Sequence, residues 1–279
     1  MNNLSYFNEY YEQPSLWGNE LTSLERERIQ KTIEFIPEDV KSILDIGCGD
    51  GRIINRLTDN YTCMGIDISK EALQHVKCQK KIGSINNIPL PDRSYNLIIC
   101  CEVLEHLPFM VYEKAITELV RVSNNYILIS VPNNESITDN MITCDYCGCK
   151  FHNCRHLRSF NPKNMSELIP DFSLVNLDVI LQNQKSYHPI ILNIAKKMKL
   201  IEPITFPDHG LCPQCGYHLT ITDKKTNLDL ELAQNTTRKN IYKETMLSIA
   251  RKIIPTHKSG GWIIALYKRQ IGITSGTAK

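Results

Sequence analysis

The chain has 279 residues, of which 42% are hydrophobic and 22% are charged, an ordinary composition for a globular protein. This composition excludes intrinsic disorder, collagen-like repeats and a small disulfide scaffold. Thirty-two Lys and Arg nearly balance 30 Asp and Glu, so the net charge of +2 predicts neither a nucleic-acid nor a membrane partner. The charge is unevenly spread, because residues 224–279 contain 11 basic and 3 acidic residues.

Hydropathy and cysteine usage predict the compartment. No run of 18 apolar residues occurs, and residues 1–11 are polar and aromatic, so we expect no membrane span, no secretory signal and a cytoplasmic protein. Six of the 11 cysteines fall within 72 residues. In a reducing compartment such a cluster indicates a metal site rather than disulfides.

The first half of the chain alternates between strand-like and helix-like segments. An aromatic arm at 4–20 precedes a helix at 21–35, and buried strands are predicted at 42–46, 63–68, 95–101 and 126–131. Helices are predicted from 52 to 57, from the Ser69 cap to about 78, and at 109–122. Strands alternating with helices predict a Rossmann-like, doubly wound, mostly parallel sheet with helices on both faces.

The second half predicts further core elements and an insertion. A helix at 161–169, capped by Asn161, is followed by a strand at 173–181, and a final strand lies at 262–267. About 80 residues separate those two strands, more than a simple connection needs. The expected organisation is an arm and helix at 1–36, a core at 37–140, a first cysteine segment at 141–160, a core continuation at 161–182, an insertion at 183–258, and a final strand and tail at 259–279.

A glycine-rich turn follows the first predicted strand. Gly47, Gly49 and Gly51 alternate along it, a spacing that lets a ligand approach the backbone and differs from the GxGxxG of dinucleotide-binding folds. Asp45 precedes the turn, and a carboxylate there suits a ligand with a cationic amino group and repels a pyrophosphate. Asp67 ends the second strand, where it can accept both hydroxyls of a ribose.

These residues resemble a known family. Leu44–Gly51 (LDIGCGDG) and Gly65–Ile68 (GIDI) are similar to the first two motifs of class I S-adenosylmethionine-dependent methyltransferases, and Gly83–Asp92 with Tyr95–His106 (YNLIICCEVLEH) resembles their ubiquinone-biosynthesis-like branch. The resemblance covers about residues 40–132. It implies that the core binds S-adenosylmethionine and transfers its methyl group.

The resemblance also implies roles for single residues. Those expected around the methionine part, the ribose, the adenine and the far wall of the cofactor site are Asp45, Gly47, Cys48, Gly49, Asp67, Ile68, Ser84, Ile85, Cys101 and Glu102. Ser84 and Asn96 stand where the family usually has acids. Ser84 accepts a hydrogen bond from the adenine amino group less strongly than a carboxylate does, so cofactor affinity is expected to be lower.

Two CxxCG motifs predict a structural zinc site. Cys144 and Cys147 form one pair, Cys212 and Cys215 the other, and four thiolates complete a tetrahedron without leaving an open position for catalysis. Closing the intervening loop costs about 4 kcal/mol, well below the roughly 10–16 kcal/mol that structural zinc contributes in small peptides. A mixed Cys/His site and a metal-free cluster are the alternatives, and four further potential ligands crowd the first pair: Cys149, His152, Cys154 and His156. We expect the zinc unit to form an inserted cap near the substrate.

Methyl transfer from a sulfonium needs alignment of the acceptor and, for a hydroxyl or amine, a base. His106 and His156 are both candidates, because each follows a strand at the predicted ligand-binding edge, and a packing or zinc-contacting role is the alternative for each. Arg155 and Arg158 are candidates for holding an anionic substrate. The aromatic arm, with Tyr6, Tyr10, Tyr11 and Trp17, either closes over the cofactor or packs against the first helix.

The acceptor is not defined by the sequence. We expect a hydroxyl or amine of a small molecule or glycan precursor, because the predicted cap is local and residues 1–223 carry a net negative charge. One alternative is an RNA methyltransferase that uses the zinc unit and the basic residues of a predicted helix at 237–254. Another is a catalytically silent partner that keeps the cofactor pocket as a scaffold.

Overall fold

The structure is a computed structural model that describes residues 9–138, 140–185, 210–218 and 256–270. It divides into two compact units. The larger comprises Asn3–Glu135, His156–Ile180 and Gly261–Lys279, and the smaller contains Ser136–Arg155 and Leu181–Gly260. Among the described residues, no helix combines the length and apolar character needed to cross a membrane. The predicted basic helix at 237–254 and Tyr6 lie outside the described residues.

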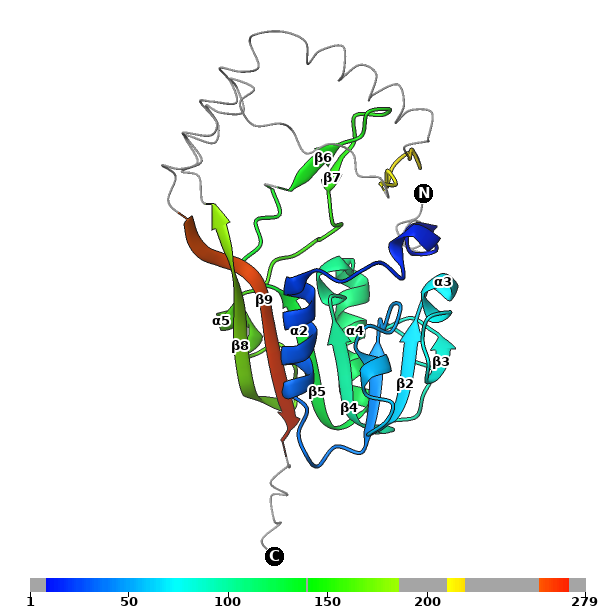
Figure 1. Cartoon of the computed structure of the whole chain (residues 1–279), viewed down its shortest axis with the longest axis vertical. Helices are drawn as coiled ribbons and strands as arrows, with labels where there is room; N and C mark the ends of the chain where they lie inside the picture. The colour runs from blue at the N-terminus through cyan, green and yellow to red at the C-terminus, as the bar shows by residue number, and fades with distance from the viewer. Residues whose placement is uncertain (1–8, 139, 186–209, 219–255, 271–279) are drawn as a thin grey trace, which may run out of the picture. The chain divides into compact units, whose positions relative to one another are not determined.

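A seven-stranded sheet forms the framework of the larger unit (Figure 1). Its order is β3-β2-β1-β4-β5-β9-β8. The strands are β1 (Ser42–Ile46), β2 (Thr62–Asp67), β3 (Gln79–Ile82), β4 (Tyr95–Cys101), β5 (Ser123–Pro132), β8 (Phe172–Lys185) and β9 (Thr256–Arg269). The first five pair in parallel, and β9 pairs antiparallel to β5. This arrangement confirms the predicted Rossmann-like, mostly parallel sheet.

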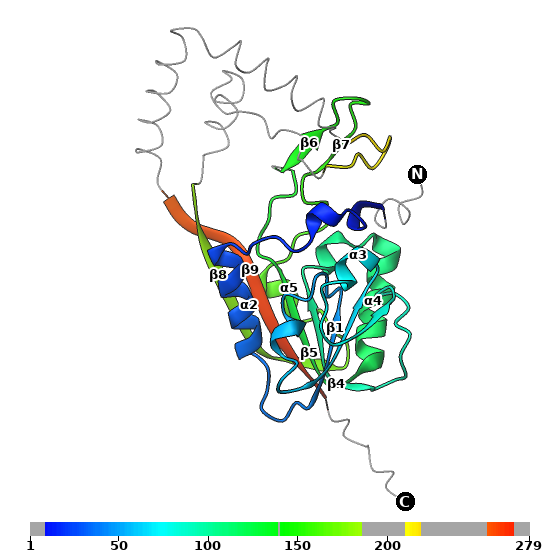
Figure 2. The same cartoon turned by 45° about the vertical axis from the view of Figure 1, so that its right-hand side comes forward.

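Helices cover both faces of this sheet, as Figure 2 shows for α2 (Ser23–Glu34) and α4 (Phe109–Val122). Ala115 and Leu119 of α4 pack with Leu44 and Ile98 in one buried cluster, whereas Ile29 of α2 packs in the other. Alternate residues of β1 and β4 point to opposite faces, so each strand contributes to both clusters. Because both faces of these strands are buried, nearly every residue along them must be apolar, as the run of β4 is. Such runs are typical of parallel strands that are buried on both sides.

Several predicted boundaries agree with the structure. Strands β1 and β4 and helix α4 span the predicted residues, and α2 begins with a capping box between Thr22 and Glu25. Ser69 caps α3 (Lys70–Leu73) through a hydrogen bond from the Ala72 N–H. Asn161 caps α5 (Pro162–Met165), whose first residue is proline, but the helix ends at Met165 and not at the predicted residue 169.

Two further predicted helices are shorter in the structure, and one strand is not predicted by the sequence. After the glycine turn the chain forms only the 3-10 helix η2 (Ile54–Arg56), and α3 ends well before residue 78. The Asn55 side chain explains the early end of α3, since it donates to the His75 carbonyl and accepts from the Lys77 N–H. It thus supplies backbone partners that a continued α3 would have supplied. The edge strand β3 was missed because its sequence is polar and exposed.

The smaller unit contains a β-hairpin of β6 (Met141–Thr143) and β7 (Lys150–His152), which are paired antiparallel. Neither strand was predicted, because three residues are too few to show a periodic pattern. Ile142 and Phe151 are buried in a small cluster with Cys144 and Cys212. The hairpin therefore packs on two of the predicted zinc ligands.

Arg121 of α4 holds the loop that follows Ser84 and Ile85. Its guanidinium donates to the carbonyl oxygens of Ile88 (2.9 Å) and Leu90 (2.8 Å), and it pairs with Glu118 at 2.7 Å. Glu118 in turn accepts a hydrogen bond from the Ile88 N–H. One ion pair therefore satisfies three backbone groups of a loop that lacks regular structure.

We predict that Arg121→Met lowers the free energy of unfolding by about 1–3 kcal/mol, because it leaves the two carbonyl oxygens without charged donors. Urea unfolding followed by circular dichroism measures the change. Lys114→Met on the exposed face of the same helix is the matched control and should change stability by less than about 0.5 kcal/mol. Equal effects of the two substitutions would contradict this role.

Candidate functional site

The candidate site lies at the carboxyl ends of β1, β2 and β4. β1 pairs with β2 on one side and β4 on the other, so the direction of strand succession reverses between β1 and β4. Open α/β sheets bind ligands at such a switch point. The structure thus brings the glycine turn after β1, Asp67 at the end of β2 and Glu102 after β4 to one edge.

The glycine turn has the backbone conformation that its sequence predicts. Gly47, Gly49 and Gly51 have φ values of +70°, +51° and +79°. A Cβ on Gly47 would lie 2.4 Å from Cγ2 of Val103, so no other residue fits there without displacement. The Gly47 N–H donates to the Ile66 carbonyl at 2.8 Å and ties the turn to β2.

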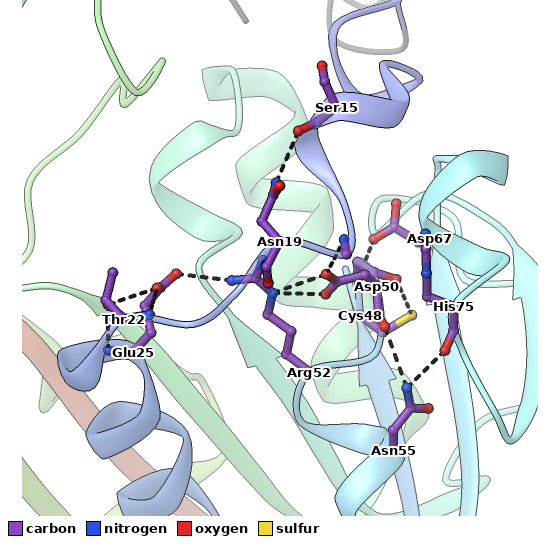
Figure 3. Close-up of polar contacts among 12 residues, drawn as sticks. Ser15, Asn19, Thr22, Glu25, Cys48, Asp50, Arg52, Asn55, Asp67 and His75 are labelled. Atoms are coloured by element: carbon purple, nitrogen blue, oxygen red, sulfur yellow. Dashed lines mark hydrogen bonds and ion pairs between the residues drawn. The ribbon is translucent and has the colours of Figure 1, made fainter.

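Asp67 joins the turn to the end of β2 (Figure 3). Its carboxylate accepts hydrogen bonds from the N–H groups of Gly49 (2.8 Å) and Ser69 (2.9 Å). Burial raises the pKa of Asp67, and these backbone hydrogen bonds oppose the increase. The carboxylate is therefore fixed where a ribose ligand would meet it.

Asp45 is more deeply buried, with 2% of its surface exposed. Burial and the negative charge of Asp67 raise the pKa of Asp45 to about 7, and the cation of Arg28 partly offsets them. A cationic ligand would favour the charged form, because an opposite charge at short range lowers the pKa of a carboxyl group. The two predicted acids thus lie close enough to interact.

The aromatic arm lies over the glycine turn. Trp17 is close to Gly49, whose Cβ would lie 3.0 Å from the indole, and the Gly18 N–H donates to Asp50 at 3.0 Å. The Glu12 carboxylate accepts from two N–H groups at the start of α3. The ring of Tyr11 meets His106 edge-on, with 6.2 Å between centroids. The arm therefore covers the turn.

A network of charged groups connects the arm to α2 (Figure 3). Arg52 pairs with Asp50 at 3.1 Å and with Glu25 at 3.0 Å, so it links the glycine turn to the first turn of α2. Asn19 donates to the Ser15 carbonyl and keeps the arm folded on itself. These contacts hold the segment between the arm and α2 against the glycine turn and the first turn of α2.

The remaining predicted cofactor residues differ in exposure. Cys48, Ile85 and Cys101 are buried, and Ile68, Ser84 and Glu102 are half-buried. Glu102 has a φ of +57°, a conformation that costs a non-glycine residue about 1 kcal/mol or more. Its carboxylate accepts hydrogen bonds from the hydroxyl of Ser130 (3.1 Å) and the indole N–H of Trp262 (2.7 Å). These two hydrogen bonds fix the side chain and help to offset the cost of the backbone conformation.

Two histidines meet near Glu102. The rings of His106 and His156 lie 4.7 Å apart between centroids, and Nδ1 of His156 is hydrogen-bonded to the Glu135 carboxylate. The side chain of Glu105 is 1% exposed, its carboxylate lies 4.0 Å from Nε2 of His106, and neither oxygen has a hydrogen-bond partner among the described residues. Burial and the charge of Glu102 raise the pKa of Glu105 well above its usual value.

The two arginines considered for an anionic substrate are engaged within the protein. Arg155 is buried and donates to the carbonyl oxygens of Asn153 and Leu211. Arg158 donates to the Leu104 carbonyl at 2.6 Å and stacks on Tyr112. Their contacts give both arginines roles in packing.

The predicted cysteine ligands come together in the smaller unit. The Sγ atoms of Cys144 and Cys215 lie 3.8 Å apart, and those of Cys147 and Cys212 lie 3.6 Å apart. A tetrahedral zinc with bonds of about 2.3 Å separates its sulfur ligands by about 3.8 Å, so the four thiols fit this metal. Cys149 and Cys154 do not belong to this cluster of four cysteines, and His156 belongs to the larger unit. The cluster therefore favours a site of four cysteines over a mixed one.

The two CxxCG turns share one backbone pattern. In each, the N–H of the glycine donates to the carbonyl of the first cysteine at 2.9 Å. Gly148 and Gly216 have φ values of +72° and +71°, which explains why glycine follows both pairs. Tyr146 and Tyr217 stack beside the turns with centroids 6.0 Å apart.

Sequence reasoning missed several residues of the site. Arg28, Glu105, Glu135 and Trp262 come from four segments that are brought together only by the fold. Glu105 alone carried a signal, because it belongs to the segment that ends at His106. The site therefore contains two further acids, Glu105 and Glu135, and the cation of Arg28 besides the residues that the sequence indicates.

Comparisons with known proteins agree with this architecture. Residues 44–125 match the family described as methyltransferase domain. An uncharacterised protein of Methanocaldococcus jannaschii is 27% identical over 168 residues, which cover 59% of this chain and 67% of that protein. Norajmaline N-methyltransferase of Rauvolfia serpentina is 32% identical over 99 residues, 30% of this chain and 32% of the enzyme.

Solved structures show the same fold. A possible histamine N-methyltransferase of Thermotoga maritima has a TM-score of 0.51 at 13% identity and covers 95% of this chain and 99% of its own. The magnesium protoporphyrin IX methyltransferase of Synechocystis has a TM-score of 0.50 at 13% identity, covering 66% and 95%. The fold and the matched residues define a class I methyltransferase domain. The chain thus carries an S-adenosylmethionine-dependent methyltransferase domain.

The buried acid Asp45 makes stability depend on pH. Because its pKa is about 7 in the folded protein and 3.8 in an ordinary environment, the folded state holds an extra proton between these values. The free energy of unfolding should therefore decline as the pH rises from about 4 to 7, by a few kcal/mol from this group. We predict that Asp45→Asn removes this decline.

Urea unfolding at several pH values measures the effect. Asp59→Asn, at an exposed position, is the matched control and should keep the wild-type profile. If Asp45→Asn shows the same decline as the wild type, the carboxyl group is not the source of the dependence.

Proposed function

We propose that this protein transfers the methyl group of S-adenosylmethionine to a hydroxyl or amine of a small molecule or glycan precursor. The observation that carries the proposal is the meeting of the glycine turn, two buried acids and a histidine pair at one switch point. The similarity to the ajmaline and norajmaline N-methyltransferases of Rauvolfia serpentina favours a small acceptor. The aligned regions cover only about a third of those relatives, so the acceptor remains part of this proposal.

The residues of the turn are suited to hold the donor. Asp67 would bind the ribose hydroxyls and Asp45 the amino group, and the backbone of Gly47 and Gly49 would adjoin the methionine part. Ile68, Ser84 and Ile85 follow β2 and β3, where the adenine would lie, and Cys48, Cys101 and Glu102 complete the wall. When bound, S-adenosylmethionine supplies an electrophilic methyl group on a positively charged sulfur.

His156 is the better oriented of the two candidate bases. The Glu135 carboxylate accepts the Nδ1–H of its ring, which fixes the tautomer whose Nε2 carries a lone pair. That atom would remove the proton of the acceptor as the new bond to carbon forms. His106 packs against this ring and against Tyr11, so it would shape the acceptor site beside the base.

Zinc would have a structural role in the smaller unit. Four cysteine ligands close the coordination sphere and leave no position for a substrate. The metal would hold together two cysteine pairs that are separated by 64 residues of sequence, and the cluster around Ile142 is too small to do so alone. We propose that it stiffens the inserted segments of the smaller unit.

Binding and transfer should respond to different substitutions. Asp67→Ala should weaken S-adenosylmethionine binding by about 1.5–3 kcal/mol through loss of charge-assisted hydrogen bonds. His156→Asn should leave binding within twofold and slow methyl transfer by about 10²–10⁴-fold. Isothermal titration measures binding, and mass spectrometry of metabolites that gain a deuterated methyl group measures transfer.

Asp59→Ala is the matched control for Asp67→Ala, since it removes an exposed acid of the same unit. Failure of the wild-type protein to bind S-adenosylmethionine would refute the proposed function. Binding without transfer to any metabolite would instead support a catalytically silent partner.

The zinc site is tested by metal analysis of the purified protein. We predict one zinc per chain, lost in Cys147→Ser because three thiolates and a hydroxyl bind the ion far less tightly. Cys154→Ser, an exposed cysteine in the same unit, is the matched control and should retain the metal. Loss of zinc from Cys154→Ser would instead indicate a mixed ligand set.

A further inference from the structure

Two large apolar side chains are exposed at the start of α4. Phe109 and Met110 are its first two residues, and each is 68% exposed. Acidic residues are favoured in the first turn of a helix because they interact with its dipole, yet the first turn of α4 contains none. Apolar residues that remain exposed add little to stability, because they bury little surface on folding. A binding role would explain their presence here.

Leu157 lies beside this helix start. It is 52% exposed, and its N–H donates at 2.7 Å to the carbonyl of Glu105, which precedes α4. The next residue, Arg158, lies over the ring of Tyr112, with 3.9 Å between the guanidinium carbon and the ring centroid. Phe109 and Tyr112 are three residues apart and therefore lie on the same side of α4. These contacts bring Leu157 to the first turn of the helix.

Phe109, Met110 and Leu157, which we call the apolar patch, adjoin the two candidate bases. Leu157 directly follows His156, and only two residues separate Phe109 from His106. The rings of these histidines lie 4.7 Å apart between centroids. The patch therefore lies at the rim of the proposed acceptor site, in the same unit as both bases.

The position of the patch favours the acceptor as its occupant. A molecule that brings a hydroxyl or amine to His156 passes these side chains, and a hydrocarbon part of it would leave water against them in the same binding event. An anionic part would find weaker support, because Arg158 already donates to the Leu104 carbonyl at 2.6 Å and lies over Tyr112. A second copy of the chain would also cover the patch, but it would obstruct the approach of any acceptor to the base.

We propose that the apolar patch binds a hydrocarbon chain or ring of the methyl acceptor, so that the acceptor is an amphiphile with its hydroxyl or amine at His156. This inference rests on the proposed function, whose acceptor class it narrows. The patch contacts a part of the substrate that does not react, so it would contribute equally to binding of the substrate and of the transition state. Phe109, Met110 and Leu157 would therefore determine KM and the choice of acceptor, and leave kcat nearly unchanged.

The test begins with the chemical nature of the acceptor. Extracts of cells that contain the protein are partitioned between chloroform and aqueous methanol. Each phase is then incubated with purified protein and S-adenosylmethionine that carries a deuterated methyl group. We expect mass spectrometry to find the labelled product in the chloroform phase. A labelled product in the aqueous phase alone would overturn the proposal.

Substitutions in the patch test the site itself. Phe109→Ser combined with Met110→Ser should raise KM for the labelled acceptor about tenfold, because less apolar surface is buried on binding, and should change kcat and the Kd of S-adenosylmethionine by less than about twofold. Phe109→Leu, which keeps an apolar side chain, should stay close to the wild type. Val175→Ser is the matched control, since Val175 is 51% exposed on the edge strand β8. An unchanged KM in the double variant, or an equal change in Val175→Ser, would contradict the role of the patch.

Two further outcomes are distinct from these. A wild-type dimer in sedimentation velocity that dissociates in the double variant would assign the patch to a second copy of the chain and overturn the proposal. If the wild type does not bind S-adenosylmethionine in isothermal titration, or binds it without labelling a product in either phase, the proposed function itself fails. That result differs from failure of the patch, in which the wild type transfers the methyl group and the substitutions leave KM unchanged.

Discussion

The structure of the site depends on the burial of two carboxyl groups, Asp45 and Asp67, at the ends of adjacent parallel strands. Burial disfavours the ionised form of each carboxyl group, because little water remains to solvate its charge. Asp67 is compensated by two N–H groups, that of Gly49 in the turn with positive φ and that of Ser69 two residues further along the chain. The turn, the strand order and the acid pair therefore require one another.

The same constraint explains the charge distribution around the site. Burial raises the pKa of Asp45, Glu102 and Glu105 together, so charged carboxylates are disfavoured at this edge of the sheet and a nearby cation would stabilise them. A donor with a sulfonium and an ammonium would supply that positive charge, and its carboxylate would need a cation in return. Electrostatics alone thus favours a zwitterionic, positively charged ligand over a phosphate.

Local sequence patterns predict the parts of this fold that local physics determines. The apolar runs of β1 and β4 and the amphipathic pattern of α4 fix these elements, and the spacing of Gly47, Gly49 and Gly51 indicates the turn. The pattern fails where a side chain from another segment supplies the backbone partners, as Asn55 does for α3. It also fails for β3, where an exposed edge strand needs no apolar residues.

The residues of the site also divide into those that the local sequence indicates and those that only the fold brings together. Asp45 and Asp67 lie at the ends of β1 and β2, and His106 comes shortly after β4. Parallel pairing alone brings them to one edge, and the sequence indicates them. Glu135 and Arg28 act through partners that are distant in sequence, and no spacing indicates such contacts. A buried polar group without hydrogen bonds is costly wherever it occurs. Buried polar atoms that lack partners are therefore a better guide to these residues than sequence motifs are. Arg28 meets that criterion without belonging to any motif of the chain.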